Sequence, residues 1–150
     1  MRSARRIDFL AVVVLLYAAL CVLPASLWFS PGQVQVGDTI LPHPPAIGFS
    51  RVIKRPTLMS YQVVIRDIQT GVGVCDPRSN PFTYVPHAKL PAVIDLVWWT
   101  GGDTRCWPRT PGVYVMETCW TIVAPLWGLL PKKVVCRESN PFTVFEGAKS

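Results

Sequence analysis

The sequence lacks the short motifs that mark common catalytic and cofactor-binding sites. It has no G-x-S-x-G nucleophile elbow, no H-E-x-x-H helix and no phosphate-binding loop. The two histidines, His43 and His87, both lie next to prolines and read as loop residues. An enzymatic alternative would pair His87 with a carboxylate such as Asp76 or Asp103. We predict instead a protein that is not an enzyme and that needs no cofactor.

Two further absences narrow the possible partners. The net charge is +6, but no run of lysine and arginine is interleaved with aromatic residues, so we expect no nucleic-acid binding. No C-x-x-C pair exists, and both histidines are remote from the cysteines, which argues against a zinc site or another bound metal. No small-molecule substrate is evident from the sequence.

Charged residues are also absent from residues 9–29, where leucine, valine and alanine dominate. As a helix, this segment would span about 31 Å, close to the hydrocarbon thickness of a bilayer. Arg2, Arg5 and Arg6 precede it, and no comparable basic cluster follows closely. The positive-inside rule therefore predicts a single-pass protein of the inner (cytoplasmic) membrane, with its N-terminus in the cytoplasm and its C-terminal domain periplasmic or extracytoplasmic.

A cleaved signal peptide is the alternative interpretation of the same segment. Cleavage after Ala25 or Ser26 would place Leu23 or Pro24 at the −3 position, where a small residue is required. Trp28 at the outer end suits the aromatic belt of a span that is retained. We therefore favour a retained anchor, with residues 1–8 as its basic cytoplasmic end.

The remaining chain reads as one small β domain. Fifteen prolines and ten glycines favour short strands joined by turns over a helical domain. Residues 30–56 are rich in proline and are predicted to be a connector, or an edge strand lying against the domain. Residues 57–150 are predicted to form a disulfide-stabilised β-sandwich.

Alternation of polar and apolar residues predicts the main strands. We expect strands at residues 59–68, 90–99, 113–122 and 142–145. In residues 90–99, the inward side chains should be Ile94, Leu96 and Trp98. In residues 113–122, Tyr114 should point inward and Cys119 outward. A Pro-Gly turn leading into a long strand that bears a tyrosine is typical of immunoglobulin-like sandwiches, so the predicted fold class is all-β and immunoglobulin-like, following one transmembrane helix.

Five cysteines divide into one within the apolar segment, Cys21, and four beyond it. An even number outside the membrane predicts disulfides in an oxidising compartment. Three pairings are open for the four, and we favour the sequential one. The expected disulfides are therefore Cys75–Cys106 and Cys119–Cys136.

A pentapeptide, SNPFT, occurs twice, at residues 79–83 and 139–143, each time shortly after a cysteine. The surrounding strands do not match, so we interpret the repeat as one local solution used twice. Ser-Asn-Pro should turn the chain, and the phenylalanine should become buried as a new strand begins.

An apolar run between two predicted strands is the main candidate for a functional surface. Polar residues are the default in such a connection, yet residues 124–133 read APLWGLLPKK. Such a loop can enter a membrane interface or a partner's pocket, or fold back as a lid over one end of the sandwich. The candidate contact residues are Leu126, Trp127, Leu129, Leu130, Lys132 and Lys133.

Two further groups are candidates for surface contacts. Trp99 and Trp107 are expected to add to an exposed aromatic surface. Arg51, Lys54 and Arg55 form a small basic cluster that either meets lipid phosphates or an acidic partner, or protects an edge strand by its charge.

Several short motifs give the chain a resemblance to a type of small protein encoded by bacteriophages and mobile elements. These motifs are Val36-Gly37-Asp38, Leu90-Pro91, Trp98-Trp99-Thr100, Pro111-Gly112-Val113-Tyr114, Thr118 with Trp120, and Ser139-Asn140-Pro141-Phe142-Thr143. The resemblance implies a membrane anchor followed by a compact extracytoplasmic β domain of unassigned function, and it implies no site residue.

The expected function is binding. The protein would act through protein–protein contacts in the cell envelope, either as an accessory subunit of a membrane complex or as a phage or plasmid exclusion factor. One alternative is a structural protein that self-associates through its anchor, and another is a small periplasmic enzyme.

Overall fold

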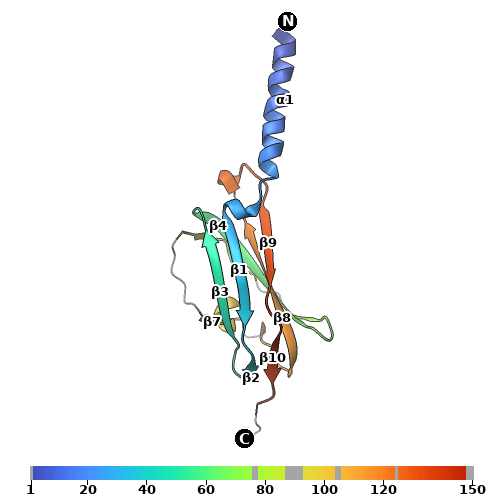
Figure 1. Cartoon of the computed structure of the whole chain (residues 1–150), viewed down its shortest axis with the longest axis vertical. Helices are drawn as coiled ribbons and strands as arrows, with labels where there is room; N and C mark the ends of the chain where they lie inside the picture. Colours follow the sequence, from blue (N-terminus) through green and yellow to red (C-terminus); the bar gives the residue numbers. More distant parts are fainter. Residues whose placement is uncertain (1, 76–77, 87–92, 104–105, 124, 148–150) are drawn as a thin grey trace.

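A long N-terminal helix stands clear of a β-rich domain that contains all the described strands (Figure 1). The computed structural model describes residues 2–75, 78–86, 93–103, 106–123 and 125–147, without the side chains of residues 2–8, 74–75 and 93. Helix α1 covers Arg2–Cys21, and a short 3-10 helix, η1 (Ala25–Leu27), connects it to the first strand.

The helix ends earlier than the expected segment of residues 9–29. Leu23 precedes Pro24, which has no backbone N–H and disfavours helical geometry in the residue before it. The chain therefore leaves α1 after Cys21 and enters strand β1 at Phe29. In the part of the chain that the structure describes, no helix combines the length and the apolar character needed to cross a membrane.

The strands form two sheets packed in a sandwich-like arrangement, so the prediction of a mostly β domain is confirmed. The first sheet has the order β1-β3-β7, from β1 (Phe29–Val36), β3 (Ala46–Ile53) and β7 (Val93–Asp95). The second has the order β2-β10-β8-β4-β5, with β6 paired to β4 and β9 to β8. Its strands are β2 (Thr39–Ile40), β4 (Thr57–Asp67), β5 (Gly73–Cys75), β6 (Phe82–Tyr84), β8 (Gly112–Ile122), β9 (Lys133–Glu138) and β10 (Phe142–Phe145).

Of the two alternatives for residues 30–56, the edge strand against the domain fits the structure, and the connector does not. Strands β1 and β3 pair with each other and make up most of the first sheet, with β1 at its edge. Phe29, Val34 and Ile47 are buried in the core. The prolines favoured a connector, but Pro42, Pro44 and Pro45 lie in the turn between β2 and β3, where a missing N–H removes no ladder bond.

Strands β4 and β8 are the centre of the second sheet and alternate as predicted. They pair antiparallel along most of their lengths, from Met59 opposite Ile122 to Asp67 opposite Tyr114. On β8 every second side chain is buried, including Tyr114 and Trp120. These apolar side chains face the first sheet and form the core between the layers.

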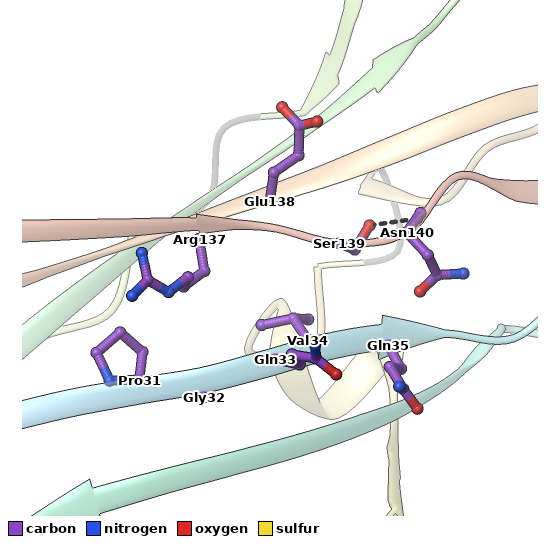
Figure 2. A pocket seen from close by; sticks show the side chains of 9 residues that line it. All are labelled: Pro31, Gly32, Gln33, Val34, Gln35, Arg137, Glu138, Ser139 and Asn140. Atoms are coloured by element: carbon purple, nitrogen blue, oxygen red, sulfur yellow. Dashed lines mark hydrogen bonds between the residues drawn. The ribbon is translucent and has the colours of Figure 1, made fainter.

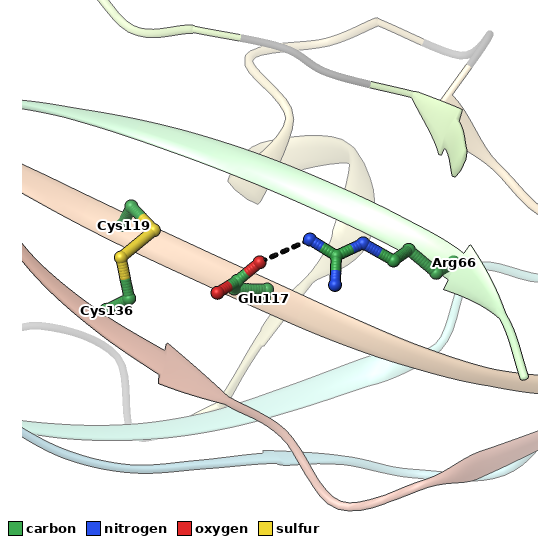
Figure 3. Close-up of polar contacts among 4 residues, drawn as sticks. All are labelled: Arg66, Glu117, Cys119 and Cys136. Atoms are coloured by element: carbon green, nitrogen blue, oxygen red, sulfur yellow. Dashed lines mark hydrogen bonds and ion pairs between the residues drawn. A yellow bond between two sulfur atoms is a disulfide. The ribbon is translucent and has the colours of Figure 1, made fainter. Parts of the chain in front are cut away.

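The predicted disulfide between Cys119 and Cys136 is confirmed, with an S–S distance of 2.03 Å. It joins opposite residues of β8 and β9 on the face of the sheet away from the core (Figure 3). Cys21 has a free thiol. The other predicted pair, Cys75–Cys106, stays a prediction because the side chain of Cys75 lies outside the described residues.

The expected strand at residues 90–99 is wrong in its second half. Residues 90–92 lie outside the described residues, β7 covers Val93–Asp95, and a short helix, α2 (Leu96–Trp99), follows. The Asp95 carboxylate accepts a hydrogen bond from the Trp98 N–H at 2.8 Å and caps this turn. The helical turn changes the spacing of the side chains, so Trp99 is buried at 4% exposure and Trp98 is 54% exposed. Both tryptophans were predicted the other way round.

The two SNPFT segments make the same backbone contacts, as expected for one local solution used twice. The N–H of Ser79 donates to the carbonyl of Tyr61 on β4, and the Tyr61 N–H donates to the Ser79 hydroxyl. Ser139 makes the same pair of hydrogen bonds with Met116 on β8. A short strand begins at the phenylalanine of each segment, as predicted, but Phe142 is buried in the core and Phe82 is not.

Candidate functional site

The apolar loop between β8 and β9 lies on the surface, as its sequence suggested. Trp127 is 93% exposed and Leu129 is 68% exposed, while Leu126 is half-buried. Leu130 differs from the prediction, because it is 4% exposed and packs in the core. We call Leu126, Trp127 and Leu129 the apolar tip and exclude Leu130 from it.

The apolar tip lies beside the end of helix α1 (Figure 1). The Tyr17 hydroxyl, one turn before the helix end, donates to the carbonyl of Leu129 at 3.1 Å. The Lys133 ammonium donates to the carbonyl of Cys21, the last residue of α1. These bonds join segments that are more than a hundred residues apart in the sequence, so the tip and the helix end form one surface.

The backbone of the tip is strained. Leu126 and Trp127 have φ values of 49° and 56°, within the 3-10 helix η3 (Pro125–Gly128). Left-handed geometry at a residue other than glycine costs about 1–3 kcal/mol, and such residues cluster at functional sites. This strain holds the indole of Trp127 outward into solvent, although burial would be the default for such a large apolar group.

Basic side chains surround the same end of the domain. Lys132 is exposed next to the tip, and Lys54 and Arg55 are exposed in the turn after β3. The Lys54 N–H donates to the carbonyl of Trp28 at 3.0 Å, which places this turn beside the segment that links α1 to β1. Arg51, the third member of the predicted basic cluster, lies apart from the other two in an aromatic pocket.

This aromatic pocket has a cavity volume of about 240 Å³. Its lining residues come from five elements, β3, β4, β6, α2 and β8, and we refer to them together as the aromatic pocket: Phe49, Arg51, Tyr61, Phe82, Tyr84, Trp98, Trp99 and Trp120. Tyr84, Trp99 and Trp120 are buried and form its base, whereas Phe82 and Trp98 are exposed at its rim. The sequence did not predict this pocket, because the rings are far apart along the chain and only the fold brings them together.

Arg51 is the charged group of the aromatic pocket. Its guanidinium lies over the ring of Tyr84, 4.7 Å from the ring centroid. Burial lowers the pKa of the Arg51 guanidinium, and the neighbouring Tyr84 partly opposes that change. Burial also raises the pKa of the Tyr84 phenol, so this group is neutral at ordinary pH and supplies no counter-charge.

A wider, polar groove of about 570 Å³ separates β1 from residues 137–140 (Figure 2). The two sides meet where the Asn140 amide bonds both the N–H and the carbonyl of Val36, at 2.8 and 2.9 Å. Apart from Arg137 and Glu138, which are exposed, its lining residues carry no charge. We assign no binding role to this gap between two edge strands.

The described side chains give no support to a metal centre. One group of candidate ligands, Glu117, Cys119 and Cys136, lies within 4.8 Å, but the two sulfur atoms are bonded to each other and are not thiolates (Figure 3). The Glu117 carboxylate instead pairs with Arg66 at 2.5 Å. The enzymatic alternative depends on His87, which lies outside the described residues together with Asp76, so its pairing with Asp76 or Asp103 stays a prediction.

Comparisons of the chain with protein-family models, with curated proteins and with solved structures each returned no match. The resemblance to small proteins of bacteriophages and mobile elements stays a prediction. The function must therefore be argued from the apolar tip, the helix beside it and the aromatic pocket.

Proposed function

We propose that this protein is a membrane-anchored binding protein of the cell envelope, whose β domain faces the extracytoplasmic side. In this role it would serve as an accessory subunit of a membrane complex or as an exclusion factor. The observation that carries the proposal is the shared surface of an apolar helix, an apolar tip and basic side chains at one end of the domain. No other end of the described domain combines these three features.

The exposed side chains of α1 support the anchor. From Phe9 to Leu20 the large apolar side chains are exposed on all sides of the helix. A helix that is apolar all round is buried in a large core or in lipid. Water disfavours so large a contiguous apolar surface, and the three arginines at positions 2, 5 and 6 suit the cytoplasmic side.

The apolar tip suits the outer interface of the same membrane. It lies beside the last turn of α1, and for a chain anchored by this helix that turn would lie where the bilayer changes from hydrocarbon to headgroups. Tryptophan is enriched at this depth, and lysine and arginine beside it would meet lipid phosphates. We therefore favour membrane contact over contact with a protein for Trp127 and Leu129.

An immunoglobulin-like type of sandwich is part of the proposal. The Tyr114 hydroxyl donates to the carbonyl of Thr110 at 2.9 Å, a contact like the tyrosine corner of that fold. One difference is the disulfide, which joins two strands of one sheet and not the two sheets. Domains of this architecture commonly act through binding, which fits the proposed role.

A charge in the middle of α1 tests the anchor. Leu15→Arg should release the full chain from the membrane pellet during alkaline extraction, because a central arginine disfavours insertion by about 2.5–3.5 kcal/mol. Leu15→Ile is the matched control and should stay in the pellet. Release of the unmodified chain under the same extraction would refute the anchor.

A further inference from the structure

The aromatic pocket is the right size for one ring. Its cavity of about 240 Å³ is smaller than the range of about 300–1,000 Å³ that is usual for drug-sized ligands. Phe82 and Tyr84 stack at 4.3 Å on one side, and Trp98 lies on the α2 side. A planar ring entering between them would make offset or edge-to-face contacts on several sides.

Arg51 gives the pocket a preference for negative charge. It is half-buried, and no carboxylate of the described residues lies within ion-pair distance of it. Burial lowers the pKa of the Arg51 guanidinium, and the described neighbour that opposes this change is Tyr84, which is neutral. A partly desolvated guanidinium without a counter-ion binds a carboxylate strongly, and its planar fork fits the two oxygens.

The same features disfavour other classes of ligand. A cationic ligand, such as a quaternary ammonium group, would be repelled by Arg51 even though the rings would attract it. A sugar would bring several hydroxyl groups into a site that is lined by aromatic residues and has Arg51 as its single charged residue. Hydroxyl groups left without partners would weaken its binding.

We infer that the aromatic pocket binds an aromatic ring that carries a carboxylate, held by the surrounding rings and by Arg51. This inference rests on the proposed binding function and names the chemistry of what is bound. Two sources offer it: an aromatic residue at the C-terminus of a partner protein, and a free aromatic acid.

Ligand-observed NMR with the full chain in detergent micelles tests the recognition step. Phenylacetate should bind at least tenfold more tightly than its neutral amide, phenylacetamide, and than benzylamine. Arg51→Gln should remove this preference, whereas Arg137→Gln, which changes an exposed arginine outside the pocket, should preserve it. Because the micelles are the same in every sample, partition of the ligand into detergent cancels in the comparison.

Further samples guard against misfolding and separate the two sources. Trp98→Ala removes an exposed rim ring and should weaken phenylacetate at least fivefold even if Arg51→Gln proves unstable. A short peptide ending in phenylalanine should bind as its free carboxylate and not as its C-terminal amide if the source is a protein. Binding of phenylacetate without binding of that peptide assigns a free acid.

Equal affinity for phenylacetate and phenylacetamide, or no binding of either, would overturn the inference. Membrane extraction of the same chain is a separate measurement, so loss of the anchor and loss of pocket binding are told apart. A chain that stays in the membrane but ignores aromatic acids refutes only the assignment of the pocket.

Discussion

At the scale of single residues, the two matching serines differ in burial: Ser139 is buried and Ser79 is partly exposed. The Ser139 hydroxyl accepts the buried N–H of Met116 at 3.0 Å, and the Ser79 hydroxyl accepts the partly buried N–H of Tyr61 at 2.9 Å. Removing an acceptor leaves a buried donor unsatisfied, at a cost of about 1–3 kcal/mol. Where water can reach the donor, the loss is smaller.

We therefore expect Ser139→Ala to lower the free energy of unfolding by about 1–3 kcal/mol, and Ser79→Ala by less than about 1 kcal/mol. Urea titration of the full chain in detergent measures both. Each variant serves as the other's control, because the pentapeptide around the serine is identical. Equal losses would mean that burial does not distinguish the two turns.

Residue periodicity was a reliable guide only where a strand was long and regular. It placed Tyr114 inside and Cys119 on the outer face, because alternation over β8 is fixed by the pleat. It failed at Trp98 and Trp99, because the Asp95 carboxylate starts a helical turn after β7. The sequence contains both signals, the capping side chain of Asp95 and the alternating pattern of a strand. Nothing local decides which of the two determines the structure.

At the scale of elements, the Cys119–Cys136 disulfide reinforces the pairing of β8 with β9. It closes a loop with a sequence separation of 17, and the chain-entropy model gives about 3 kcal/mol for such a loop. Replacing both cysteines with serine should lower the free energy of unfolding by about that amount.

Urea titration under non-reducing conditions tests this expectation. Cys21→Ser is the control, because Cys21 has a free thiol, and it should leave the midpoint unchanged. A double variant as stable as the unmodified chain would show that the strand pairing alone holds β9 in place.

Elements were also mispredicted where local composition and tertiary pairing disagree. The prolines of residues 42–45 favoured a connector, yet they occupy the turn between β2 and β3, and the chain on both sides of this turn carries core residues, such as Val36 and Ile47. The pairing of β3 with β7 joins segments almost fifty residues apart, and no local pattern encodes it. Long-range pairing therefore decided the domain boundary.

At the scale of the whole molecule, the proposed orientation on a membrane predicts that the side chain of Trp127 enters the lipid interface. In vesicles that contain brominated lipids, Trp127 should be quenched, because it lies beside the end of α1 and is 93% exposed. Trp127→Ser should therefore remove much of the lipid-dependent quenching that the six tryptophans show together.

Trp98→Ser is the matched control, since Trp98 is also exposed but belongs to the aromatic pocket. This variant should retain the quenching. If Trp127→Ser is quenched as strongly as the unmodified chain, the apolar tip does not enter the interface.

The two candidate sites differ in how well the sequence could predict them. The apolar tip was predictable, because it is a continuous run in an unusual place. Its position against Tyr17 and Cys21 was not, since contacts across more than a hundred residues leave no local trace. The aromatic pocket was harder still, because its rings come from five elements and each ring alone reads as ordinary core.

The short linker between α1 and β1 limits how far the domain can travel. This linker consists of residues 22–28. Leu23, Ala25 and Trp28 pack against the core, so the linker allows little rotation of the domain relative to the helix. If α1 is anchored in a bilayer, the aromatic pocket then keeps a constant distance from the membrane surface and a constant orientation relative to it. Partner proteins held in the same membrane would meet it at a high effective concentration.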